Sequence, residues 1–266
     1  NSNVWNLDMD LKWDPEEFDD KVKRCFQEVY FPGPKVNKTV SLSGGLDSTL
    51  ILSVLRPHRL SATSCSWEDD GTVDDQDNVF MIKESELAER TCQEFGKEFY
   101  KSTVPHDFNH LMKETYYAMG MPVWDRNRLI PRYVNCKHAA QNRNKVYIVG
   151  DCADEMLTGY NGDFNTFSPK HAKKRNWNKQ SIPTHLFGND HINNYLFYRT
   201  LMEGESFCVV ADHLAGRFGM ESRVPFLHQD LAKYIFKIPG VYKLHVPFKH
   251  DTFAKDNKKK KEQRCW

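Results

Sequence analysis

One short stretch, residues 43–48 (SGGLDS), constrains the fold more strongly than any other part of this chain. Residues 38–42 before it (KTVSL) combine β-branched and apolar side chains and predict a buried strand. After it, apolar residues at positions 50, 51, 54 and 55 recur at the spacing of one helical face. The two glycines therefore occupy a tight strand-to-helix turn, where residues without a Cβ atom adopt backbone angles that others avoid.

A turn of this kind is suited to binding phosphate groups. Its backbone amides and the positive end of the following helix both attract anions. Ser43 and Ser48 add hydroxyl donors, and the carboxylate of Asp47 can hold a magnesium ion. The turn is not a Walker P-loop, because no Lys follows Gly45. A glycine turn that binds nothing is the alternative, and the hydroxyl and carboxylate groups of the string argue against it.

Composition limits the partners of this chain. Lys and Arg number 37 and Asp and Glu 36, so the net charge of +1 provides no general attraction to nucleic acid. No apolar run reaches the length of a membrane span, and no secretory signal opens the chain. The seven cysteines include no C-x-x-C pair, which argues against a disulfide framework and a zinc site. We therefore expect a cytoplasmic protein with no nucleic-acid or membrane partner.

Strand and helix patterns alternate along the chain. Strands are predicted at 38–42, 60–66, 97–104 and 146–149, with helices at 84–95, 108–119 and 131–142 between them. This order predicts an α/β fold with a parallel sheet and helices on both faces. Further helical patterns at 192–201, 207–218 and 229–236 predict a helical C-terminal part.

Three regions are predicted from the same patterns. Residues 1–36 form a lead-in whose helix begins with Asp14 as cap and Pro15 at the first helical position, and packs on the body. Residues 37–255 form the main domain, with a long surface excursion at 159–190. Residues 256–266 form a basic tail, and its run of four lysines is read as a solvated end.

A second polar cluster follows the strand at 146–149. Gly150 and three carboxylates, Asp151, Asp154 and Glu155, come directly after this strand. Ligands of parallel sheets bind at the carboxyl ends of the strands, so this turn and the glycine turn should face one crevice. Acids at a helix N-terminus are favoured by the helix dipole in any case. Beside a phosphate loop, however, a carboxylate here can share the magnesium ion.

These motifs resemble those of a known family. The string 43–48 resembles the PP-loop of ATP pyrophosphatases. Residues 150–155, followed by Gly159 and Tyr160, resemble the second ATP-site motif of asparagine synthetases, and residues 221–227 (ESRVPFL) resemble their third motif. The resemblance covers roughly residues 35–240, and three motifs in order identify the synthetase-domain family, which includes β-lactam synthetases and lasso-peptide cyclases.

The resemblance implies roles for individual residues and a PP-loop ATP pyrophosphatase fold. It implies an ATP site formed by Ser41, Leu42, Ser43, Gly44, Gly45, Asp47, Ser48 and Gly150. It implies a Mg²⁺ ion held by Asp47 and Asp154. Catalytic roles fall to Asp151, Glu221 and Lys249, while Arg223 is expected to be a structural ion-pair partner.

The chain also departs from the family pattern. Cys152 replaces a Gly and His228 replaces an Asp. Lys249 lacks the Leu and Arg that follow the catalytic lysine in the family, so Lys243 is a rival for that role. The 42 residues before the loop cannot hold the family's glutaminase domain.

Three functions remain open on these grounds. The first is an AMP- and pyrophosphate-forming ligase that converts aspartate to asparagine, with ammonia that is free or supplied by a separate glutaminase. The second keeps this chemistry and changes the acid or the amine, as in β-lactam synthetases. The third is an ATP-binding regulatory protein that has lost catalysis, which the altered lysine pattern motivates.

Overall fold

The computed structural model describes residues 14–31, 36–68, 76–122, 125–160, 186–188 and 190–244, without the side chains of 76–83 and 205. In this part of the chain, five strands form one sheet in the order β3-β2-β1-β4-β5. All four pairings are parallel. The strands are β1 (Lys38–Ser41), β2 (Ser61–Trp67), β3 (Glu98–Val104), β4 (Val146–Ile148) and β5 (Glu221–Arg223).

The register aligns the carboxyl ends of the central strands. Val40 of β1 pairs with Ala62 of β2 on one side and with Ile148 of β4 on the other. The turns that follow β1 and β4 therefore leave the sheet at the same edge. The four strands predicted from hydrophobic patterns are confirmed, whereas β5 was not predicted, because its three residues are polar and show no apolar alternation.

Helices connect the strands and complete the C-terminal part. They are α1 (Pro15–Tyr30), α2 (Leu46–Leu55), α3 (Gln76–Phe95), α4 (Asn109–Met119), α5 (Arg126–Gln141), α6 (Ala153–Leu157), α9 (His191–Arg199), α10 (Glu205–Gly216) and α11 (Gln229–Lys237). A π-helix (Thr200–Gly204) joins α9 to α10, and short 3-10 helices occupy Pro225–Leu227 and Gly240–Lys243. Asp14 caps α1 as expected, with its carboxylate accepting from the amide of Glu16 at 2.9 Å.

Both faces of the sheet are covered by helices, as predicted. Val146 and Ile148 of β4 pack in one buried cluster with side chains of α1, α2, α3 and α11. Tyr147 and Val149, which point the other way, pack in a second cluster with side chains of α4, α5 and α10. A strand buried on both faces belongs to a parallel sheet held between two helical layers.

Two helices begin earlier than their sequence patterns predicted. Helix α5 begins at Arg126 and not at Pro131, because Asp125 caps it by accepting from the amide of Arg128 at 3.2 Å. Pro131 is the sixth residue of this helix and lies inside it, where its missing amide removes one backbone hydrogen bond. Helix α3 begins at Gln76, whereas its sequence pattern predicted a start at residue 84.

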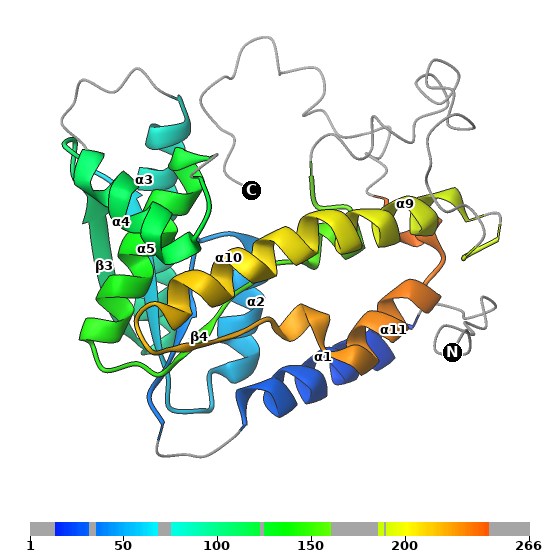
Figure 1. Ribbon diagram of the computed structural model, residues 1–266. Helices are drawn as coiled ribbons and strands as arrows, with labels where there is room; N and C mark the ends of the chain where they lie inside the picture. Colours follow the sequence, from blue (N-terminus) through cyan, green and yellow to red (C-terminus); the bar gives the residue numbers. More distant parts are fainter. Residues whose placement is uncertain are drawn as a thin grey trace, which may run out of the picture.

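Helix α1 packs on the body of the protein. It lies against α2 and α11 (Figure 1), and Phe26 meets Phe226 edge to face at 5.0 Å between ring centres. Residues 1–13 of the lead-in and the basic tail at 256–266 lie outside the described residues. Among the helices that are described, none has the length and apolar character needed to cross a membrane.

The first prediction concerns the attachment of α1. Phe26 is fully buried, so Phe26→Ala should lower the free energy of unfolding by about 3–5 kcal/mol, through lost apolar burial and a cavity. Phe31, at the end of the same helix, is 58% exposed and supplies the control Phe31→Ala, which should cost much less. Urea unfolding of both variants measures the difference, and equal losses would contradict the packing of α1.

Candidate functional site

A cavity of about 720 Å³ opens at the carboxyl edge of the sheet. This volume lies within the range of about 300–1,000 Å³ that is usual for small-molecule sites. Its lining includes eight of the residues to which the resemblance assigned a role in ATP binding, metal binding or catalysis: Ser41, Leu42, Ser43, Asp47, Ser48, Gly150, Asp151 and Asp154. The turn after β1 and the turn after β4 therefore face one cavity, although about a hundred residues separate them in sequence.

The glycine turn is shaped by a position that only glycine fits. Gly44 has a φ of +83°, and a Cβ atom there would lie 2.5 Å from the carbonyl oxygen of Glu84 on α3. Hydrogen bonds close the turn on itself. The amide of Ser43 donates to Oγ of Ser48 at 3.2 Å, and the amide of Gly45 donates to Oγ of Ser43 at 3.2 Å. The N-terminus of α2 is thereby held at the cavity, where its unpaired amides can meet an anion.

The acidic turn lies directly against the glycine turn. A Cβ atom on Gly150 would lie 3.2 Å from the amide nitrogen of Ser48 and 3.4 Å from Cβ of Asp47, so the two backbones nearly touch. The chain then passes through Cys152, whose φ of +73° is unusual for a residue with a side chain, and enters α6. Asp154 and Glu155 fall in the first turn of α6.

Burial and crowding of acids shift the pKa values in this cavity. Burial, with the nearby charges of Asp154 and Glu155, raises the pKa of Asp47 to about 7. Burial alone raises the pKa of Glu84 to about 7. Burial also raises the pKa of Glu155, although the hydroxyl of Tyr160 donates to its Oε1 at 2.6 Å and opposes the shift. Perturbed carboxyl groups gathered in a cavity are characteristic of functional sites.

The charges on the lining suit a cation that accompanies a polyphosphate. Two arginines, Arg128 and Arg132, face six carboxylates: Asp47, Glu84, Asp125, Asp151, Asp154 and Glu155. No group of three or more His, Cys, Asp or Glu in the described parts of the chain is arranged to hold a metal ion by itself. Mg²⁺ commonly binds through one or two carboxylates together with substrate phosphates. The carboxylates of Asp47 and Asp154 fit that mode of binding.

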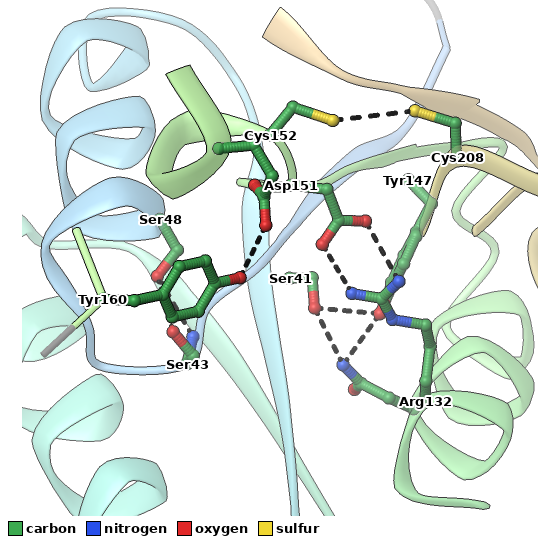
Figure 2. Close-up of polar contacts among 11 residues, drawn as sticks. Ser41, Ser43, Ser48, Arg132, Tyr147, Asp151, Cys152, Tyr160 and Cys208 are labelled. Carbon is green, nitrogen blue, oxygen red and sulfur yellow. Dashed lines mark hydrogen bonds and ion pairs between the residues drawn. The ribbon is translucent and has the colours of Figure 1, made fainter. Parts of the chain in front are cut away.

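Arg132 on α5 forms an ion pair with Asp151 across the cavity wall (Figure 2). Its two terminal nitrogens donate to the two carboxylate oxygens at 3.0 and 2.7 Å, which is a bidentate arrangement. Both side chains are largely buried but reach the cavity lining. Asp151, one of the predicted catalytic residues, is therefore held in a fixed orientation and paired with a permanent cation.

A buried network fixes α5 to the ends of the central strands. Asn135 donates to the hydroxyl oxygens of Tyr147 and Ser41 at 3.0 and 3.3 Å, and accepts from Thr63 at 2.6 Å. The hydroxyl of Tyr147 donates to Oγ of Ser41 at 2.9 Å (Figure 2). Strands β1, β2 and β4 are thus tied to the helix that carries Arg132, which gives the cavity a rigid floor.

The structure places Glu221 and Lys243 away from this cavity. Glu221 is exposed, begins β5 opposite Val146, and pairs with Arg223 at 2.9 Å, so it lies at the amino edge of the sheet. Lys243 is buried against Phe236, where its ammonium group donates to Oδ1 of Asn193 at 2.7 Å. Burial lowers the pKa of Lys243 to about 7. Lys249 lies outside the described residues.

The motifs also missed several residues that line the cavity. These residues are Arg132, Arg128 and Asn127 on α5, Glu84 on α3 and Ser206 on α10. Arg128 and Arg132 are four residues apart, so both lie on one face of a helix. That spacing was a usable signal, but it appears only once the helix is known to begin at Arg126.

The fold and the cavity together define a class of protein. It is an α/β protein whose parallel sheet presents a glycine turn and an acidic turn at its carboxyl edge, where nucleotides bind in open sheets. Comparison with family models matches residues 34–255 to asparagine synthase. Because this match covers most of the chain, the protein belongs to the asparagine synthase family, which consists of ATP-using ligases, as its motifs had indicated.

A search of the solved structures includes the NH₃-dependent NAD synthetase from Campylobacter jejuni subsp. jejuni, in complex with the nitrate ion. That protein is 11% identical in sequence, and the alignment covers 78% of this chain and 92% of that one, with a TM-score of 0.37. A search of the curated proteins found no match.

The second prediction tests the glycine turn. Gly44→Ala should lower the free energy of unfolding by on the order of 2 kcal/mol, because the new Cβ needs a left-handed backbone and meets the carbonyl of Glu84. Gly216→Ala is the matched control, since a Cβ there has open space, and it should be neutral or mildly stabilising. Chemical denaturation measures both, and a neutral Gly44→Ala would contradict the turn geometry.

The third prediction follows from the raised pKa of Glu84. The Glu84 carboxyl has a pKa of about 7 in the folded protein and 4.5 in the unfolded chain, so the folded state binds its proton more tightly. Protonated Glu84 therefore favours folding at low pH, and this contribution to the free energy of unfolding is lost as pH rises from 4.5 to 7. Glu84→Gln removes this loss. Relative to wild type, the variant should gain on the order of 2 kcal/mol between pH 4.5 and 8.

Unfolding curves at several pH values measure this gain. Glu86→Gln, on the same helix but exposed, is the matched control and should keep the wild-type pH profile. Parallel pH profiles for Glu84→Gln and wild type would contradict the burial of Glu84.

Proposed function

We propose that this chain activates a carboxylate with ATP and joins the acyl group to an amine. A carboxylate oxygen attacks the α-phosphorus, the bond to the β-phosphate breaks, and pyrophosphate leaves. The amine nitrogen then attacks the acyl carbon of the adenylate, AMP departs, and the amine loses a proton. The observation that carries the proposal is the single cavity that unites the glycine turn with the acidic turn.

The glycine turn would bind the phosphates of ATP. The hydroxyl groups of Ser43 and Ser48 lie 3.1 Å apart on the lining and can turn from each other toward an anion. The amides at the start of α2 add donors that no side chain occupies. Backbone groups of Ser41, Leu42 and Gly150 lie at the same edge and are assigned to the adenosine.

Asp47 and Asp154 would hold a Mg²⁺ ion together with the phosphates. The raised pKa of Asp47, caused by burial and by neighbouring acids, supports this role, because a nearby cation would favour the ionised carboxylate. When bound, Mg²⁺ supplies positive charge that neutralises the departing pyrophosphate. Ser43 and Ser48 of the proposed phosphate site are uncharged, so they do not themselves neutralise the phosphates.

Arg132 and Asp151 would receive the acyl and amine groups. Two of the five N–H donors of Arg132 are used by Asp151, so the remaining donors are available to a carboxylate or phosphate oxygen. Asp151 keeps unused lone pairs that can accept a hydrogen bond from an amine. Because Arg132 pairs with it, Asp151 acts in the proposal by orienting the amine, and it takes up the proton only after nitrogen has become cationic.

The proposed substrates are aspartate and ammonia, which is free or delivered by a separate glutaminase. Family membership supports this choice. A different acid or amine would use the same cavity, so the acid is to be found by a screen. We place the reaction in the cytoplasm, since the six cysteines that the structure describes are free thiols.

A second candidate is an ATP-binding protein that does not catalyse ligation. It is favoured by one observation, which is that no lysine is among the described residues lining the cavity. Developing negative charge would then lack the ammonium group that the family uses, unless Lys249 supplies it. This candidate predicts ATP binding without any release of pyrophosphate.

The fourth prediction tests the proposed function directly. With ATP, Mg²⁺, aspartate and ammonium, the chain should release AMP and pyrophosphate in equal amounts and form asparagine. Asp154→Asn should lower this rate by about a hundredfold or more, because the Mg²⁺ ion that neutralises the phosphate charge would lose one of its ligands. Glu221→Gln is the matched control and should keep a rate near wild type, since Glu221 lies at the other edge of the sheet.

The assay separates the candidates by their products. ADP in place of AMP would contradict the adenylation step. ATP binding without pyrophosphate release, across a panel of acids and amines, would favour the non-catalytic candidate. Pyrophosphate exchange with an acid other than aspartate would keep the chemistry and change the substrate.

A further inference from the structure

Two cysteines face each other at the back of the acidic turn. Sγ of Cys152 lies 3.9 Å from Sγ of Cys208 on α10 (Figure 2). The two residues are 56 positions apart in sequence, so this contact is made by the fold and not by local chain geometry. Cys152 is buried but belongs to the cavity lining, and Cys208 is partly exposed.

The surroundings hold the Cys152 thiol in place. A Cβ atom on Gly204 would lie 2.9 Å from Sγ of Cys152, so this glycine leaves space for the sulfur. Gly204 ends the π-helix Thr200–Gly204, and Cys208 follows one helical turn later. Short π-helical segments are rare and occur often at functional sites. The helix junction therefore presents Cys208 to Cys152 with no side chain between them.

The two thiols are electronically unequal. The hydrogen bond between them lowers the pKa of Cys208 when Cys152 donates. Cys208 is thus the thiol that more readily becomes a thiolate, and it is also the more exposed of the two.

We propose that Cys152 and Cys208 form an oxidative modification site, at which a peroxide converts the two thiols into an intramolecular disulfide. The thiolate of Cys208 attacks one peroxide oxygen, the O–O bond breaks, and a sulfenic acid and hydroxide form, and the hydroxide takes up the proton that the Cys208 thiol had released to solvent and becomes water. Sγ of Cys152 then attacks the sulfenic sulfur, the S–O bond breaks, and a second water leaves with the thiol proton. The two thiols lose two electrons and two protons, and hydrogen peroxide is reduced to two waters.

Formation of the bond would move the acidic turn. A disulfide has an S–S distance of about 2.05 Å, so the sulfurs must approach by almost 2 Å from their present separation of 3.9 Å. Cys152 lies between Asp151, which pairs with Arg132, and Asp154, which is assigned to the metal. Drawing this turn toward α10 displaces both carboxylates from the glycine turn. We therefore expect the oxidised form to bind ATP more weakly.

The experiment uses the full chain, reduced and then freed of reductant. The protein is treated with hydrogen peroxide, remaining thiols are alkylated, and peptides are mapped by mass spectrometry. A cross-linked peptide pair holding Cys152 and Cys208, lighter by two hydrogens, is expected in wild type and should vanish on addition of dithiothreitol. Cys208→Ser should abolish it, whereas Cys92→Ala, which alters a buried cysteine on α3, should retain it.

Affinity for MgATP is then compared by calorimetry. The oxidised wild type should bind about tenfold more weakly than the reduced protein, and dithiothreitol should restore the affinity. Reduced Cys208→Ser should bind as reduced wild type does, which assigns the loss to the bond and not to the side chain. If the reduced chain binds no ATP, the proposed function fails, but the peptide map still decides whether the disulfide forms.

Two results would overturn the proposal. One is oxidation of Cys208 to a sulfenic or higher acid without any cross-link to Cys152. The other is a complete Cys152–Cys208 cross-link that leaves the affinity for MgATP unchanged, which would show that the bond does not move the turn.

Discussion

The parallel register between β1 and β4 is the constraint on which the site depends. Val40 pairs with Ile148, so both strands end at the same level and their turns emerge side by side. At that level Gly150 approaches the start of α2 so closely that a single added carbon would touch its backbone. A slip of one residue would turn every side chain of β4 to the opposite face of the sheet. The geometry of the cavity therefore depends on the backbone pairing of β1 with β4.

Local patterns predicted the parts of this structure that local chemistry determines. Four strands, the glycine turn and the acidic turn all have their signals within a few residues, and parallel pairing follows from the alternation of strands and helices. Strand β5 was missed because it is short, polar and stabilised by pairing with β4 alone. The early start of α5 was missed because Pro131 is a stronger boundary signal than the cap at Asp125. Arg132 was missed for the same reason.

Motif order predicted the family correctly but not the position of every motif residue. Glu221 opens a parallel strand, and a residue at the start of such a strand lies at the edge away from the ligand. Its position two residues before Arg223 allows both side chains to share one face, where they pair with each other. Lys243 follows α11 and is buried, with its ammonium group donating to Asn193 and lying over the ring of Phe236. A linear motif carries no information about strand direction, so these placements required the fold.

An acidic cavity and a polyanionic substrate are compatible only if cations stand between them. Both arginines on the described lining are paired with carboxylates, Arg132 with Asp151 at 2.7 Å and Arg128 with Asp125 at 3.4 Å. The carboxylates repel phosphate, so in the proposed function they would bind the metal ion and the amine that lie beside it. The glycine turn supplies neutral donors, and the acidic turn supplies ligands for cations. The acidic turn also contacts α10 through Cys152 and Cys208. In our proposal, a disulfide between these two residues therefore moves the turn that supplies the ligands for cations.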